Sequence, residues 1–169
     1  MPSPAFQPSL GLRADEAAAL EREIRHAHES LHVCLREMEQ VLARPAFDAG
    51  ALTSVRLKLA GLRLTRGPLI TRVAEALSGS LSRDEEILLE QLRSSHQRLL
   101  QTATAHTGKW TLEAIGLNWV QYRDETRDLM RRWMIKAERE QRLVYPLVRR
   151  CARAGGLSRN TRFRHCTRG

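Results

Sequence analysis

Aromatic residues make up only 5% of the 169 residues, and no segment alternates between apolar and polar residues as a strand would. Ala, Leu, Glu, Gln and Arg dominate instead, a mixture that favours helix. The chain lacks any run of about 18 apolar residues, so no transmembrane segment is predicted. Residues 1–12 contain three prolines and no basic-then-apolar arrangement, so no secretory signal is predicted either. We therefore expect an all-α cytoplasmic protein.

The chain has only three cysteines, which are widely spaced and include no Cys-x-x-Cys pair. Neither a zinc ribbon nor a disulfide framework is therefore indicated. We expect Cys34, which lies in a helical stripe, to be a small buried apolar residue. The sequence also contains no glycine-rich phosphate loop, no nucleophile elbow and no credible Ser-His-Asp or Cys-His set. These absences favour a non-enzymatic protein.

The net charge of +9 comes mostly from one end of the chain. Residues 149–169 contain seven arginines and no acidic residue, whereas the other 21 of the 28 basic residues are balanced by 19 acidic ones. Because Gly155 and Gly156 stand among polar residues there, the composition of residues 151–169 predicts a disordered basic tail. Such a tail can bind nucleic acid or an acidic membrane surface weakly and non-specifically. It can equally be a solubilising end without a partner.

Residues 14–150 contain four patterns in which apolar residues recur every three or four positions, as they do on one face of a helix. The first pattern begins near Ala14 and stops at Pro45, because the residue before proline disfavours the helical conformation. The second spans residues 52–77. Pro68 interrupts it and predicts either a kink or two shorter helices.

The third pattern starts after Ser82, which opens a Ser-Arg-Asp-Glu capping box. A short connection that has room for one helical turn then leads to Asn118, the expected N-cap of the last helix. That helix should reach about Arg150, with a kink at Pro146. Four long amphipathic helices with short connections predict an up-down-up-down four-helix bundle, which follows a flexible segment over residues 1–13.

Each apolar stripe carries a polar or charged residue near its middle. In the last helix, Lys136 and Glu140 stand four residues apart on the face that also carries apolar side chains. Charges are almost never buried unless they are paired or bind a ligand. Mid-helix residues of antiparallel helices can meet in one layer, which is where bundles build their sites. We therefore predict a buried polar cluster composed of His28, Arg66, His96, Lys136 and Glu140.

Three short motifs surround members of this cluster. His28 lies in His-Glu-Ser-Leu, His96 lies in Ser-Ser-His-Gln-Arg-Leu, and Lys136-Ala-Glu-Arg-Glu140 is followed by Tyr145-Pro-Leu. Together they resemble the hemerythrin-like (HHE cation-binding) domain family, whose last helix carries His-x-x-x-Glu followed by an aromatic residue and Pro-Leu. The resemblance covers about residues 14–150. It implies a hemerythrin-like bundle with a carboxylate-bridged di-iron site, used for oxygen binding or sensing.

The resemblance is incomplete at the metal ligands. Lys136 stands where the family has the histidine of the last helix, and Arg66 and Ile70 stand where a His-x-x-x-Glu pair is expected in the second helix. Ferrous ions need several anionic or imidazole donors and are repelled by neighbouring cations. We therefore expect a degraded di-iron site without a cofactor, in which salt bridges neutralise Glu140 and the two histidines, His28 and His96, donate or accept hydrogen bonds. The expected role is regulatory or sensory.

Two alternatives stay open. His28, His96 and Glu140 stand at family ligand positions, and two histidines with one carboxylate form a facial triad that holds iron in other proteins. A retained mono- or di-iron site would make the protein oxygen- or redox-responsive. In the other alternative, the polar cluster is only a structural ionic network. The protein is then a helical interaction module with an unknown protein partner and a basic tail.

Overall fold

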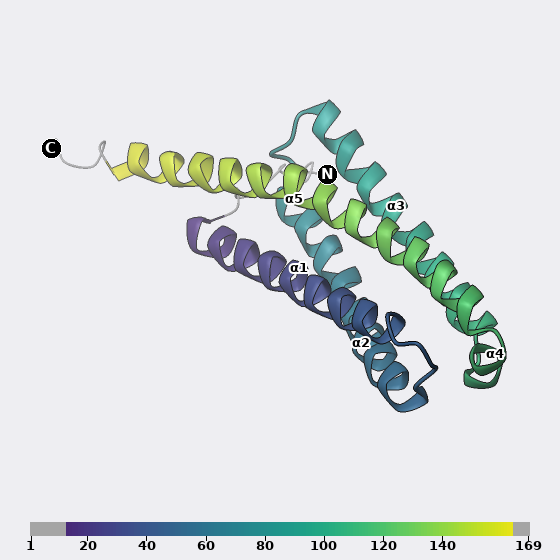
Figure 1. The fold of residues 1–169 in the computed structure, drawn as a ribbon. Coiled ribbons are helices and arrows are strands. Elements are labelled where there is room, and N and C mark those ends of the chain that lie inside the picture. The colour runs from purple at the N-terminus through teal and green to yellow at the C-terminus, as the bar shows by residue number, and fades with distance from the viewer. Residues whose placement is uncertain (1–12, 164–169) are drawn as a thin grey trace, which may run out of the picture.

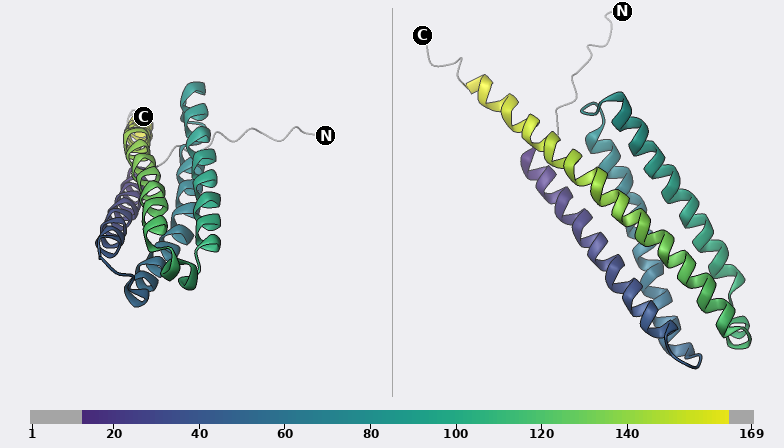
Figure 2. Two further views of the ribbon diagram at one scale, coloured as in Figure 1. Left: turned by 45° about the vertical axis from the view of Figure 1, so that its right-hand side comes forward. Right: turned by 45° about the horizontal axis from the view of Figure 1, so that its top comes forward.

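The computed structural model describes residues 13–163, and all the regular secondary structure in this range is helical. The predicted all-α class is therefore confirmed. Four long helices and one short one follow in the order α1 (Ala14–Leu42), α2 (Ala49–Leu77), α3 (Arg83–Lys109), α4 (Leu112–Leu117) and α5 (Trp119–Phe163). The long helices lie side by side, α1 against α2 and α5, and α3 against α5 and α2 (Figures 1 and 2). None of these helices is long and apolar enough to span a membrane.

The helix starts follow from side chains that bind free backbone amides. The Ser82 hydroxyl accepts from the amide of Glu85, and the Glu85 carboxylate accepts from the amide of Ser82 at 2.9 Å, so the predicted capping box is confirmed. Asp48 caps α2 by accepting from the amide of Ala51 at 2.9 Å, which starts this helix three residues before the predicted Leu52.

Neither internal proline divides its helix. α2 continues through Pro68 and α5 continues through Pro146, so the expectation of two shorter helices in place of α2 is wrong. Both prolines are exposed. Water can therefore bind the carbonyl group that each proline leaves without an amide donor, and the helix tolerates the missing bond.

The last helix is longer than the sequence indicated, because α5 ends at Phe163 rather than near Arg150. Residues 151–163, which were predicted to begin the basic tail, thus continue the helix. Cys151 is buried in the apolar core, and no proline follows Pro146 to stop the helix. Residues 1–12 and 164–169 lie outside the described residues. Most of the predicted flexible N-terminal segment and the end of the predicted basic tail fall there.

Asn118 joins α4 to α5 in a different way from the predicted cap. Its backbone carbonyl accepts the first hydrogen bond of α5, from the amide of Tyr122 at 3.0 Å. Its side-chain amide does not cap α5 but donates backward to the carbonyl of Ala114 in α4, at 3.2 Å. The connection thus holds the single short helix that the sequence indicated, and it places α3 and α5 side by side (Figure 1).

The apolar core is interrupted by a polar layer. On α1, His28 lies between the buried residues Ile24 and Leu31. On α3, His96 likewise lies between buried leucines, and on α5 Lys136 and Glu140 follow the buried Trp133. Buried apolar side chains on both sides of this layer shield it from water, so its charges must be compensated inside the protein.

A buried ion cluster as the candidate functional site

All five members of the predicted polar cluster are buried. The exposed fraction is 2% for His28, 4% for Arg66, 3% for His96, 5% for Lys136 and 3% for Glu140. Lys136 and Glu140 are therefore not a solvated pair at the edge of the stripe, and Arg66 does not reach out to water.

Glu140 lies at the centre of the cluster. Its Oε1 atom accepts from the ammonium group of Lys136. Its Oε2 atom accepts from the guanidinium group of Arg66 and lies 3.0 Å from Nε2 of His28. Arg66 also donates to the backbone carbonyl of Ala27, at 3.1 Å. The carboxylate on α5 thus binds side chains from α1, α2 and α5 itself, and it ties three helices together.

Tyr145 completes the contacts of His28, and the sequence analysis did not assign it to the site. Its hydroxyl lies 2.9 Å from Nδ1 of His28. Because Glu140 is an acceptor, Nε2 of a neutral His28 ring carries the proton, Nδ1 accepts, and the Tyr145 hydroxyl donates. Burial raises the pKa of Tyr145, which keeps this donor protonated. Tyr145 follows Val144 and so lies beside the apolar stripe rather than on it.

The charges in the cluster favour an ionised Glu140. Burial alone raises the pKa of this carboxyl group, but the hydrogen bond from His28 and the positive charges of Arg66 and Lys136 outweigh burial and lower the pKa to about 2. Burial lowers the pKa of Lys136, although Glu140 opposes that change. Two basic side chains, Arg66 and Lys136, thus face a single carboxylate.

His96 shares the layer but does not bind Glu140. Neither of its ring nitrogens has a hydrogen-bond partner among the described residues. Burial lowers the pKa of His96 to about 4, with further lowering by Lys136 and Arg66, so the ring is neutral at pH 7. The ring instead packs edge-on against Trp133, with centroids 5.8 Å apart. The expectation that His96 is a hydrogen-bond partner in the network is therefore corrected.

The residues of the cluster do not fit an iron site. Within the described part of the chain, no group of three or more His, Cys, Asp or Glu side chains is arranged to hold a metal ion. The proposed ligand set of His28, His96 and Glu140 is thus not gathered for coordination. Both oxygens of Glu140 already accept hydrogen bonds from cations, and the ammonium group of Lys136 would repel a dication at this place.

Comparison with known proteins adds no relative. No family model matches the chain, and no curated protein and no solved structure matches it. The resemblance to the hemerythrin-like family therefore rests on the sequence motifs around His28, His96 and Glu140, and the function has to be argued from the site itself.

Proposed function

We propose that this protein is a non-enzymatic, hemerythrin-like four-helix bundle with a degraded di-iron site, and that its role is regulatory or sensory. One observation carries the proposal. Both carboxylate oxygens of Glu140 accept hydrogen bonds from cations, Lys136 and Arg66. These cations occupy two positions at which the resemblance expects metal ligands.

The substitution has a simple physical logic. A metal centre in a bundle neutralises the inward-facing carboxylates and links the helices that carry them. In this chain the side chains of Arg66 and Lys136 supply fixed positive charge to Glu140, and His28 supplies a hydrogen bond. The helices are then linked without a redox-active group, which favours a role through binding rather than through oxygen chemistry.

The proposal is tested by metal analysis of protein purified and kept under anaerobic conditions with added ferrous iron. We expect no stoichiometric iron, and the same melting temperature with iron as with a chelator. About two irons per chain, lost in the His96→Ala variant, would overturn the proposal and restore an oxygen- or redox-linked role. One iron per chain, lost in the same variant, would favour a single-metal site at His28, His96 and Glu140.

A helical interaction module is the second candidate, and the exposed face of α2 favours it. Leu57 and Leu64 are 68% and 78% exposed, and their spacing of seven residues places them on one side of the helix. A Leu57→Asp/Leu64→Asp variant that keeps its fold but loses a protein partner would support this candidate. No described contact favours nucleic acid or a membrane surface, since Arg149 and Arg150 are paired with Glu21 and Glu85.

A further inference from the structure

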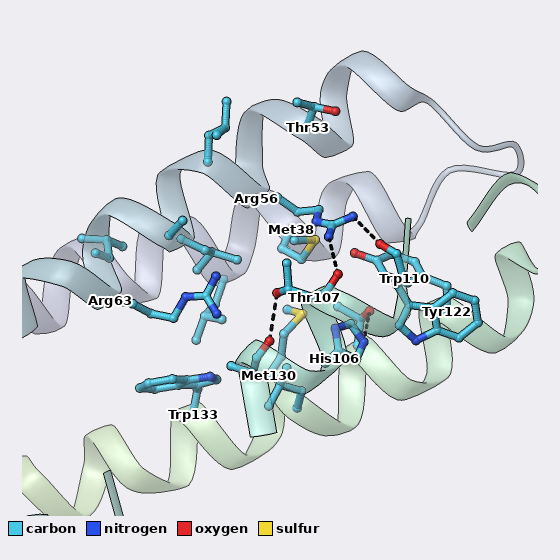
Figure 3. Close-up of a pocket in the computed structure, with 18 of the residues that line it drawn as sticks. Met38, Thr53, Arg56, Arg63, His106, Thr107, Trp110, Tyr122, Met130 and Trp133 are labelled. Carbon is cyan, nitrogen blue, oxygen red and sulfur yellow. Dashed lines mark hydrogen bonds between the residues drawn. The ribbon is translucent and has the colours of Figure 1, made fainter. Parts of the chain in front are cut away.

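A cavity of about 400 Å³ lies between the ion cluster and α4 and is lined by residues of α1, α2, α3 and α5 (Figure 3). Its volume falls in the range of small-molecule sites, about 300–1,000 Å³. Most of its wall is apolar and comes from side chains that include Leu35, Met38, Leu59, Leu129, Met130 and Trp133. Two further lining residues, Leu57 and Leu112, are exposed, so the cavity reaches the surface between α2 and α4.

The polar part of this wall is positively charged. Among the described residues that line the cavity there are three arginines, Arg56, Arg63 and Arg66, and no aspartate or glutamate. All three lie on α2, and Arg56 and Arg63 are seven residues apart on the same side of that helix. The sequence analysis did not predict a role for Arg56 and Arg63. Each directly follows an apolar residue of the α2 stripe, a position that the pattern assigns to the solvent-exposed face of the helix.

The three arginines differ in their partners. Arg56 donates to the backbone carbonyls of Trp110, at 3.0 Å, and Thr107, at 3.3 Å. Arg66 binds Glu140, but its Nε atom is buried without a hydrogen-bond partner. Arg63 is half-buried and has neither an acidic partner nor a hydrogen bond among the residues whose side chains the structure describes.

Figure 3 shows the guanidinium group of Arg63 directed into the space next to Trp133 and Met130. Burial lowers the pKa of Arg63, and the charge of Arg56 lowers it further. Among the described residues, no neighbouring anion raises it again, as a paired carboxylate would. Buried cations are stable when an anion pairs with them. Arg66 of the ion cluster also lines the cavity and adds a further guanidinium group to its wall.

We propose that this cavity binds a small amphipathic carboxylate, whose acid group pairs with Arg63 and whose apolar chain lies along Leu35, Met38 and Leu129. A carboxylate suits the planar guanidinium group because two parallel N–H groups can donate to its two oxygens. A single acid group suffices, since Arg56 and Arg66 already donate to other acceptors. The proposal does not depend on whether the ion cluster has replaced a metal, and it gives the sensory role a ligand class.

Decanoate, used below its micelle concentration, is the probe. Calorimetric titration of the full-length protein should show one site per chain, with quenching or a shift of tryptophan fluorescence, because Trp110 and Trp133 line the cavity. Decanol and decyltrimethylammonium carry the same chain without the negative charge, and acetate carries the acid group without the chain. Each of the three should bind at least about tenfold more weakly than decanoate.

The Arg63→Gln variant keeps the polar side chain but removes the charge, and it should bind decanoate about 10- to 100-fold more weakly. Arg72→Gln is the matched control, since Arg72 lies on the same helix but pairs with Glu23 on the outside. A second variant, Ala60→Phe, fills the cavity from its wall and should abolish binding. Circular dichroism and melting curves establish that each variant is folded.

The proposal is overturned if decanoate shows no saturable binding, or if Arg63→Gln and Arg72→Gln bind it equally well. It is also overturned if decanol binds as tightly as decanoate, because the cavity would then be a non-specific apolar site. Iron uptake by the same protein would overturn the proposed function but not this inference. Failure of decanoate binding, in turn, would leave the metal analysis unaffected.

Discussion

Lys136 donates to Glu140 one turn further along α5, and both side chains are buried beneath apolar residues of the neighbouring helices. On an exposed surface such a pair contributes little to stability, about 0.3–0.5 kcal/mol. In the interior the same charges have lost their hydration, so each depends on the others. This dependence leads to the following predictions.

Replacing the whole cluster should cost far less than breaking it. In the variant Arg66→Met/Lys136→Met/Glu140→Leu, no buried charge is left over, because all three ionic groups are removed together. Buried ion networks replaced by apolar residues of similar volume often give unchanged or higher stability, by about 1–4 kcal/mol. Chemical denaturation should therefore show a free energy of unfolding at or above the wild-type value. A loss larger than that of any single substitution would contradict the account.

His96→Leu should leave the protein equally stable or make it more stable at pH 7. Both ring nitrogens of His96 are buried without partners, and an apolar side chain removes that cost, about 1 kcal/mol or more. Urea unfolding of the variant measures the change. The matched control is His26→Leu, because His26 is exposed and its replacement should change little. A clear loss of stability in His96→Leu alone would indicate that His96 has a partner.

His96 should also make stability depend on pH. Its folded pKa is lowered from the ordinary value of 6.5 to about 4, so the unfolded chain binds the proton more readily. The titration of His96 therefore does not reduce the free energy of unfolding above pH 6.5. As the pH falls from 6.5 to 4, it lowers the free energy of unfolding by at most about 3 kcal/mol. The curve for His96→Leu should be flatter across this window. Equal slopes for variant and wild type would contradict the prediction.

Glu140 should act in a lower pH window than His96. Its pKa is lowered from 4.5 to about 2, so its contribution is present above pH 4.5 and is lost as the pH falls from 4.5 toward 2. Carbon-13 NMR of the labelled carboxyl group should show Glu140 still ionised at pH 3.5. A midpoint near the ordinary value would mean that Arg66 and Lys136 do not hold the charge.

Tyr145→Phe should cost about 1 kcal/mol of unfolding free energy, because His28 would lose the hydroxyl that donates to Nδ1. Nitrogen-15 NMR of the imidazole should show the Nε2-protonated form in the wild type. The variant should give a broadened or mixed signal, since the second contact that fixes the tautomer is gone. An unchanged spectrum together with unchanged stability would remove Tyr145 from the site.

The sequence was sufficient to predict the layer of the site but not its contacts. Lys136 and Glu140 were expected to be buried because their spacing follows the apolar stripe, and the same periodicity placed His28 and Arg66. The periodicity of apolar residues shows which face of a helix a residue lies on, but not which way its side chain points. It could therefore not predict that His28 forms hydrogen bonds and His96 does not. Tyr145 was missed because it lies one position off the stripe.

The limits of the other predictions have physical causes as well. Pro68 was expected to kink α2 or to divide it into two shorter helices. It does not divide the helix, because its exposed position lets water replace the lost hydrogen bond. The end of α5 was placed too early because Gly155 and Gly156 weaken a helix only by about 1 kcal/mol each. Arg63 was overlooked because a cation without a partner cannot be recognised until the neighbouring helices are in place.

The central claim is that cations of the protein, rather than a metal, hold the charge of Glu140. The most direct measurement is the free energy of unfolding of Glu140→Gln in the presence of a chelator, beside Glu138→Gln as an exposed control on the same helix. We predict a loss of about 3–5 kcal/mol for Glu140→Gln, because Arg66 and Lys136 would remain buried without their anion. The control should change by less than about 1 kcal/mol. If Glu140→Gln is as stable as the wild type or more stable, as expected for a ligand removed from an empty metal site, the account is contradicted.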